Sequence, residues 1–309
     1  MGIINDILDF SKIEAGKLDI ETLEFDLDEV FNSVAVVTSE KAEQKGLEYL
    51  FDVETNVPKR LKGDPLRLGQ VLINLINNAI KFTEEGEVCV QCRVVGNDAE
   101  QVRLRFEVRD SGLGMSESQS SKLFMPFSQG DESTTRKFGG TGLGLSISKG
   151  MVNLMSGEIA LQSEFGKGTI VSFEIPFGIV EASLVEAERE LFDQLNMLIV
   201  DDHPHAAELL GAKLAHYGIR SILTYSGQEA MTVLNEAERE NRQFDAIFVD
   251  LHMPYMDGAE LIAQIRQSPL RMLPKIALVG ATARESLNYR EEATITDAYL
   301  DKPFNSSNT

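Results

Sequence analysis

Residues 74–82 read N-L-I-N-N-A-I-K-F and place polar side chains on an otherwise apolar helix. Asn74, Asn78 and Lys81 are spaced so that they share one face of the helix predicted from Pro65 to Phe82. Asparagine is unfavourable inside a helix, so its repeated use indicates a chemical role. A carboxamide oxygen can bind Mg²⁺ and an ammonium neutralises phosphate, which predicts a nucleotide site. The alternative, a solvated helix face, is disfavoured by the apolar neighbours.

A second cluster, D-S-G-L-G-M at 110–115, follows a predicted strand. Asp110 can accept a hydrogen bond from an exocyclic amine, while Gly112 and Gly114 allow the backbone to approach a flat ring. Alone, such a strand followed by D-S-G is often only a turn.

Two more clusters complete the pattern. L-F-M-P-F-S-Q at 123–129 offers two aromatic rings in a loop that could fold over a ligand. G-G-T-G-L-G-L at 139–145 leads into a predicted helix, whose first N–H groups can bind phosphate. The turn G-K-G-T at 166–169 joins the last two predicted strands of this half.

In this order, the clusters resemble the ATP-binding domain of the GHKL sensor histidine kinases over about residues 25–177. The resemblance implies an α/β sandwich in which ATP lies between a mixed sheet and helices under a mobile lid, residues 115–140. It implies that Asn78 binds Mg²⁺, that Asn74 and Lys81 face the phosphates, and that Asp110 reads the adenine amine. The other implied ATP-binding residues are Gly112, Gly114, Phe124, Phe127, Gly140, Thr141, Gly142, Leu143, Gly144 and Thr169.

The residue four positions before Asn78 separates kinases from ATPases in this family. Chaperone and gyrase relatives carry a glutamate there that activates water, whereas this chain carries Asn74. An amide is no general base near neutral pH. The sequence therefore favours phosphoryl transfer to a side chain over rapid ATP hydrolysis.

After about residue 196, short apolar runs alternate with amphipathic stretches, which predicts a parallel sheet covered on both faces. Asp201, Asp202 and Asp250 follow two of these runs, and Lys302 follows the fifth. Ligands bind at this edge of a parallel sheet. Carboxylates that converge there need a cation between them, which predicts a Mg²⁺ site.

The segments L-I-V-D-D-H, V-D-L-H-M-P-Y-M-D-G and Y-L-D-K-P-F resemble those of response-regulator receiver domains, whose fold is a flavodoxin-like doubly wound (βα)5. The resemblance implies that Asp250 accepts the phosphoryl group, that Asp201 and Asp202 hold Mg²⁺, and that Lys302 pairs the phosphoryl oxygens. Receivers usually carry Thr or Ser where this chain has Gly280, and Thr282 comes two positions late. Phosphoryl acceptance is therefore expected, and propagation of a switch is in doubt.

The opening residues I-N-D-I-L-D-F-S-K-I-E-A-G-K-L resemble the end of the second dimerisation and phosphotransfer helix of the same kinases. In that family the phosphorylated histidine lies on the preceding helix. The histidines here are His203, His205, His216 and His252, all in the second half. The expectation is a fragment or truncated product that lacks the phosphoacceptor histidine and does not label itself on histidine.

Composition excludes several other functions. The 309 residues carry 29 Lys plus Arg against 49 Asp plus Glu, a net charge of −20, which disfavours nucleic acid and anionic lipid. No apolar stretch approaches a membrane-spanning length and no signal peptide is evident. Cys89 and Cys92 spell C-V-Q-C, but they lie on a predicted strand, where residues three apart point to opposite faces. A strand is therefore favoured over a redox or zinc site.

We therefore expect the cytoplasmic portion of a hybrid sensor histidine kinase, a protein-histidine kinase that uses ATP and Mg²⁺. The expected parts are a helix end at 1–22, the ATP-binding domain at 23–180, an acidic linker at 181–195 and a receiver with a truncated last helix at 196–309. Expected partners are a histidine-phosphotransfer domain or protein and a second copy of the chain. An upstream sensor region in the inner membrane is left open. The alternative is a regulatory module that binds ATP and accepts phosphate but catalyses nothing alone.

Overall fold

The structure, a computed structural model, describes residues 3–98, 100–126, 142–180, 195–280 and 296–304. The chain divides into two compact units, residues 1–182 and 183–309, which are described separately. None of the helices in these ranges combines the length and apolar character that a bilayer crossing requires. The finer domain bounds given above stay predictions.

The first unit is a mixed sheet covered by helices on one face. The sheet runs in the order β1-β3-β7-β5-β4-β2, and β6 pairs with β7. Its strands are β1 (Leu23–Asp26), β2 (Glu48–Val53), β3 (Arg60–Gly63), β4 (Glu87–Asn97), β5 (Gln101–Asp110), β6 (Glu158–Glu164) and β7 (Gly168–Ile179). Its helices are α1 (Ile3–Glu14), α2 (Leu27–Glu43), α3 (Pro65–Phe82), the short α4 (Glu117–Ser120) and α6 (Gly144–Leu154).

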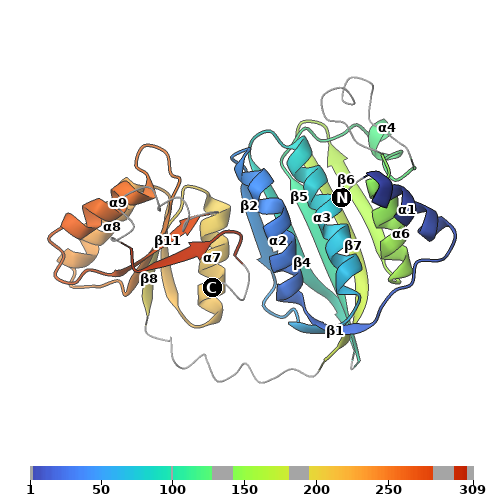
Figure 1. Ribbon diagram of the computed structural model, residues 1–309. Coiled ribbons are helices and arrows are strands. Elements are labelled where there is room, and N and C mark those ends of the chain that lie inside the picture. The colour runs from blue at the N-terminus through green and yellow to red at the C-terminus, as the bar shows by residue number, and fades with distance from the viewer. Residues whose placement is uncertain (1–2, 99, 127–141, 181–194, 281–295, 305–309) are drawn as a thin grey trace. The chain divides into compact units, whose positions relative to one another are not determined.

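The core of this unit lies between the sheet and the helices α2, α3 and α6, which lie side by side in Figure 1. Phe106 stacks on Phe173 with ring centroids 5.0 Å apart, and both rings are fully buried. The strong apolar stripe of α3, including Leu72 and Ile76, faces the same core. The predicted mixed α/β sandwich is confirmed.

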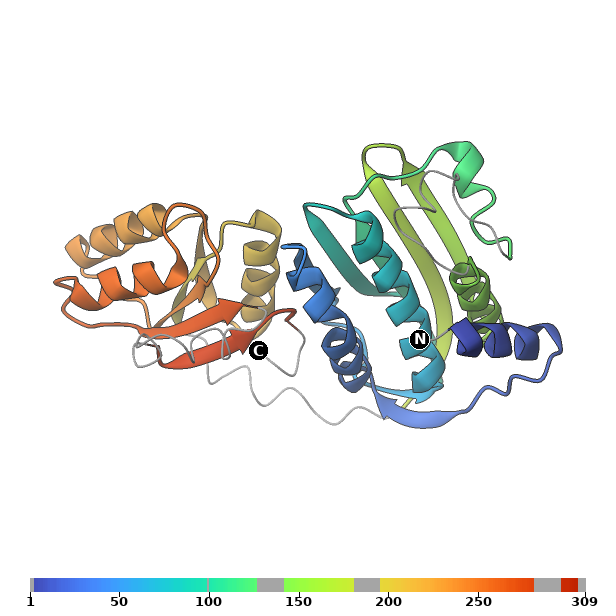
Figure 2. The same ribbon diagram turned by 45° about the horizontal axis from the view of Figure 1, so that its top comes forward.

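The opening helix packs against the first unit. Both views show α1 beside α6 (Figures 1 and 2). Phe10 and Ile13 pack on the core, and Gly150 of α6 leaves the space that Ile13 occupies, because a Cβ there would lie 2.7 Å from it. The helix end expected at 1–22 is shorter in the structure, since α1 ends at Glu14 and Gly16 adopts a φ of +60°.

The second unit is a five-stranded parallel sheet in the order β12-β11-β10-β8-β9, the order expected of a doubly wound fold. Helix α7 packs with one apolar cluster, and α8 and α9 pack with another, so the two faces of the sheet are covered separately. The elements are β8 (Asn196–Val200), α7 (Pro204–His216), β9 (Arg220–Thr224), α8 (Gly227–Arg239), β10 (Ala246–Asp250), α9 (Gly258–Gln267), β11 (Lys275–Gly280) and β12 (Ala298–Asp301).

The two cysteines lie on β4, as predicted. Both are buried, and only Cys92 belongs to the core beneath the helices, so the two side chains face opposite sides of the strand. Burial raises the pKa of the Cys89 thiol to about 12. These thiols therefore favour a structural role.

Candidate functional site

Helix α3 carries the polar face predicted from residues 74–82, and both of its ends are anchored. At its start, Asp64 accepts a hydrogen bond from the backbone N–H of Arg67 at 3.0 Å. At its end, Lys45 donates to the carbonyl oxygens of Ile80, Lys81 and Thr83 at 2.5, 3.0 and 2.8 Å. Sequence reasoning missed Lys45, because its partners are backbone atoms distant in the chain.

The neighbouring asparagines of α3 bind different helices. The Asn74 Nδ2 donates to Ser148 Oγ of α6 at 2.7 Å, and the Asn77 Oδ1 accepts from Lys41 Nζ of α2 at 2.7 Å. Asn78 lies one turn after Asn74 and therefore shares its face. The structure thus places Asn74 against α6 and Asn77 against α2, while only the helical spacing relates Asn78 to Asn74.

Lys81 lies at the end of the same face, where partial burial lowers the pKa of its ammonium group. Its Nζ lies 4.9 Å from the ring centroid of Phe82. A nearby anion such as a phosphate would favour the charged ammonium and oppose the effect of burial.

Asp110 ends β5 with only 7 % of its surface exposed. Burial raises the pKa of its carboxyl group, and hydrogen bonds from the backbone N–H groups of Gly112 and Thr169 oppose that rise. The Gly112 N–H lies 2.9 Å from Oδ1. A buried acceptor with this environment can read an amine of a bound ring.

The glycines after Asp110 allow the turn to approach α3 closely. A Cβ at Gly112 would lie 2.4 Å from the Phe82 carbonyl oxygen and 2.9 Å from Thr83 Oγ1. Gly114 has a φ of +62°, a conformation that favours glycine. Thr83 therefore lies beside this turn, one residue after the end of the sequence pattern.

The start of α6 lies beside Asn74, on the polar face of α3. Gly142 has a φ of +69°, and Leu143 caps α6 without a side-chain hydrogen bond. The first N–H groups of α6 therefore receive no cap from that side chain, as an anion site requires. The Phe124 ring centroid lies 5.7 Å from Lys149 Nζ of α6. The predicted residues Phe127, Gly140 and Thr141 lie outside the described ranges.

In the second unit, a buried lysine joins two of the predicted carboxylates. Lys302 Nζ lies 2.8 Å from Asp201 Oδ2 and 2.8 Å from Asp250 Oδ1. The two aspartates are only 4 % and 6 % exposed. The backbone N–H groups of His203 and His252 donate to the other oxygens of this pair at 2.9 Å each.

Asp202 supplies a further oxygen to this region. Its Oδ1 is buried without a hydrogen-bond partner in the described ranges, and it lies 3.5 Å from His203 Nδ1. A buried oxygen left this way is expensive unless a cation or water meets it. Together with Asp201 and Asp250, it gives three carboxylates against one ammonium, a donor set that fits Mg²⁺.

The end of β11 carries no hydroxyl at the residue opposite this pocket. Val279 pairs with Asp250, and the Gly280 carbonyl oxygen accepts from the Lys302 N–H at 3.0 Å. Gly280 is therefore the last residue of β11. Thr282 lies outside the described ranges.

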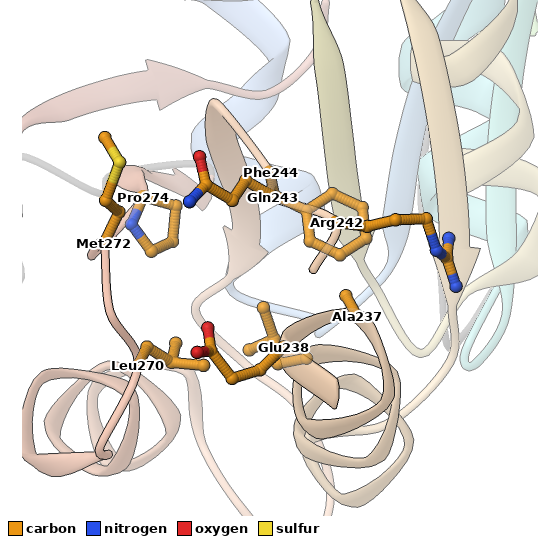
Figure 3. A pocket seen from close by; sticks show the side chains of 9 residues that line it. Ala237, Glu238, Arg242, Gln243, Phe244, Leu270, Met272 and Pro274 are labelled. Atoms are coloured by element: carbon orange, nitrogen blue, oxygen red, sulfur yellow. The ribbon is translucent and has the colours of Figure 1, made fainter. Parts of the chain in front are cut away.

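A small pocket elsewhere in this unit holds none of the predicted site residues (Figure 3). Figure 3 shows Phe244, Leu270 and Pro274 among its lining residues. They precede β10 and β11, whereas Asp250 ends β10. The pocket therefore lies at the opposite edge of the sheet from the carboxylates.

Both units match known protein families. Residues 63–179 match the histidine kinase-, DNA gyrase B- and HSP90-like ATPase family, and residues 197–309 match the response regulator receiver domain. The sensory/regulatory protein RpfC of Xanthomonas campestris pv. campestris is 33 % identical over 336 residues, covering 98 % of this chain and 46 % of RpfC.

A second relative is similar over most of this chain. The signal transduction histidine-protein kinase BarA of Escherichia coli K12 is 36 % identical over 242 residues, covering 78 % of this chain and 24 % of BarA. The chain thus spans less than half the length of these relatives. The solved structure of full-length ShkA in complex with AMPPNP is similar in fold, with a TM-score of 0.75 and 24 % identity over 98 % of this chain and 59 % of ShkA.

Proposed function

We propose that the chain is part of a hybrid sensor histidine kinase, in which the first unit binds Mg-ATP and donates the γ-phosphoryl group to a histidine, which passes it to Asp250. The bond from the γ phosphorus to the β–γ bridging oxygen breaks, a bond to the histidine nitrogen forms, and ADP leaves. The polar face of α3 opposite the start of α6 is the observation that carries this proposal.

In this proposal, different residues of the first unit bind the adenine, the phosphates and the metal ion of the nucleotide. Asp110 accepts from the adenine amine, and Gly112 and Gly114 let the ring approach. Lys81 and the N–H groups at the start of α6 bind the phosphates. Asn78 would hold Mg²⁺, which when bound offsets the charge on the phosphates. Asn74 in place of a glutamate disfavours hydrolysis.

In the second unit, Asp250 acts as the nucleophile toward a phosphorylated histidine. Lys302 balances charge on the phosphoryl oxygens from its position beside Asp250 and Asp201. Asp201, Asp202 and Asp250 would hold Mg²⁺, which would add positive charge to that of Lys302 and so offset the repulsion among these carboxylates. The phosphoryl donor or acceptor partner is a histidine-phosphotransfer domain or protein.

The same family resemblance suggests where this segment works and what it contacts. We propose that it works in the cytoplasm, contacts neither nucleic acid nor lipid, and pairs with a second copy through dimerisation helices of the longer protein. Ile7 and Leu8 of α1 are about half exposed, so part of that helix remains available for such a contact.

A second candidate function rests on the position of the histidines, all of which follow residue 202. By itself the chain would then bind ATP and accept phosphate without catalysing histidine phosphorylation. Labelling with γ-³²P-ATP separates the two, because acid-labile, base-stable label on this chain would contradict the second candidate.

Calorimetric titration with AMP-PNP tests the nucleotide site. We expect saturable binding that weakens when Mg²⁺ is removed. Absence of binding with Mg²⁺ present would contradict the proposed function, whatever the state of Asp250.

A further inference from the structure

Ser148 on α6 is a buried hydroxyl that none of the family patterns above singles out. It is 1 % exposed, and its Oγ accepts from Asn74 Nδ2 at 2.7 Å. This hydrogen bond joins residues 74 positions apart and connects the helix of the polar face to the helix that follows the glycine-rich segment.

Gly144, one turn before Ser148 on α6, completes the environment of Asn74. A Cβ at Gly144 would lie 2.5 Å from Asn74 Oδ1 and 3.2 Å from Nδ2. The carboxamide therefore fills the space above the first turn of α6, with its oxygen nearest that turn. Only glycine leaves this space free.

These contacts give the nitrogen and the oxygen of the Asn74 side-chain amide different environments. The nitrogen is committed to Ser148, and the oxygen points toward the first turn of α6, where the phosphates are proposed to bind. A carboxamide oxygen is an acceptor and cannot donate to phosphate oxygens. It can instead accept from an N–H or O–H group that approaches the γ-phosphate.

We propose that Ser148 is a positioning residue that holds Asn74 with its Oδ1 toward the reacting phosphate. In this orientation Oδ1 can accept a hydrogen bond from the nucleophile that attacks the phosphate. The inference rests on the proposed function for its catalytic meaning. The orientation itself is a property of the nucleotide-free protein and is measured without nucleotide.

The test compares Ser148→Ala with Ser146→Ala. Ser146 lies on the same helix, and its Oγ donates to the Leu143 carbonyl oxygen at 2.8 Å rather than meeting Asn74. Both variants therefore lose a hydroxyl group from α6, but only Ser148→Ala loses the contact with α3.

The first measurement is the side-chain amide signal pair of Asn74 in ¹H–¹⁵N spectra, identified by its absence in Asn74→Ala. Ser148→Ala should shift this pair toward the position of a free amide and speed its exchange with water, whereas Ser146→Ala should leave it in place. An unshifted pair in Ser148→Ala would overturn the inference. Ser148→Cys, close in size with a weaker acceptor, should shift the pair in the same direction and serves if the alanine variant does not fold.

The second measurement is the slow hydrolysis of γ-labelled ATP by the chain, in which water replaces histidine as the acceptor. Ser148→Ala should lower kcat about 3- to 10-fold and leave KM within about 2-fold, as expected for one neutral hydrogen bond that orients the nucleophile. Equal kcat in Ser148→Ala and wild type would overturn the catalytic role. If wild type binds no AMP-PNP, the proposed function fails, while the spectra still decide the orientation.

Discussion

The two units carry opposite sets of side chains at their candidate phosphate sites. In the first, amides, a lysine and glycine turns surround the candidate site, and the described contacts of Asn74 and Asp110 lead to Ser148 and Gly112 rather than to one another. In the second, Lys302 contacts Asp201 and Asp250 directly. No described contact joins Asn74 to Asp110 in the first site, whereas the second site already contains a buried ion pair.

This difference fits the ligand that we propose for each site. An intact nucleotide brings several negative charges, so a site without opposing carboxylates is favourable, apart from the buried acceptor for the base. A phosphoryl acceptor needs a carboxylate nucleophile, and its repulsion with neighbouring carboxylates has to be offset by a lysine and a cation. We therefore expect substitutions to affect binding in the first unit and stability as well as chemistry in the second.

The largest expected effect is at Asp250. Asp250→Ala removes the nucleophile, so acetyl phosphate with Mg²⁺ should add one phosphoryl mass to wild type and none to the variant. Intact-mass spectrometry measures this. Equal mass gain in both proteins would remove Asp250 from the site and with it the contrast between the units.

Lys302→Met should affect the stability of the second unit. It leaves Asp201 and Asp250 close together without their shared ammonium, and breaking a buried pair costs about 3–5 kcal/mol. Urea unfolding should show this loss in the transition of the second unit, with partial recovery when Mg²⁺ is added. A loss below about 1 kcal/mol would contradict the view that this site is held together by charge.

Asp110→Asn should weaken nucleotide binding without weakening the fold. Losing a charge-assisted hydrogen bond of about 1.5–3 kcal/mol lowers AMP-PNP affinity roughly 10- to 150-fold. Burial raises the Asp110 pKa, so its contribution to stability is present at low pH and is lost as pH rises through the folded-state value. At neutral pH the variant should therefore unfold at the same or a higher temperature.

Calorimetry and thermal unfolding of the same Asp110→Asn sample check both halves of that expectation. Unchanged affinity would remove the adenine-site assignment. A fall of several degrees in Tm at neutral pH would show that the carboxylate stabilises the fold, as in the second unit.

The smallest effect is expected at Asp297, a carboxylate of the second unit that lies away from the phosphoryl site. Lys275, the Ile276 N–H and Arg266 bind it and lower its pKa. Asp297→Asn should cost about 1 kcal/mol, since the pairs are partly exposed.

The stability that Asp297 contributes is present above its ordinary pKa of 3.8 and is lost as pH falls through the lower folded-state value. Urea unfolding of wild type and Asp297→Asn at pH 7 and at acidic pH measures this. A difference that grows as pH falls would contradict the assignment, and phosphorylation by acetyl phosphate serves as the control that should not change.

Regular elements with a strong period were predicted closely. The helix Pro65–Phe82 has the predicted bounds, because its apolar spacing and the Asp64–Pro65 pair at its start are local features of the sequence. The short strands β1 and β3, four residues each, were missed. Their partners are distant in sequence, and four residues are too few to display a period.

The sequence by itself determined the two domain types, the candidate carboxylates and amides, and their order along the chain, since these depend on residue chemistry and local spacing. Only the tertiary structure decided which groups meet. It paired Lys302 with Asp201 and Asp250, Lys45 with the end of α3, and Ser148 with Asn74. Each contact joins segments far apart in the chain, and packing alone sets such distances because no local pattern records them.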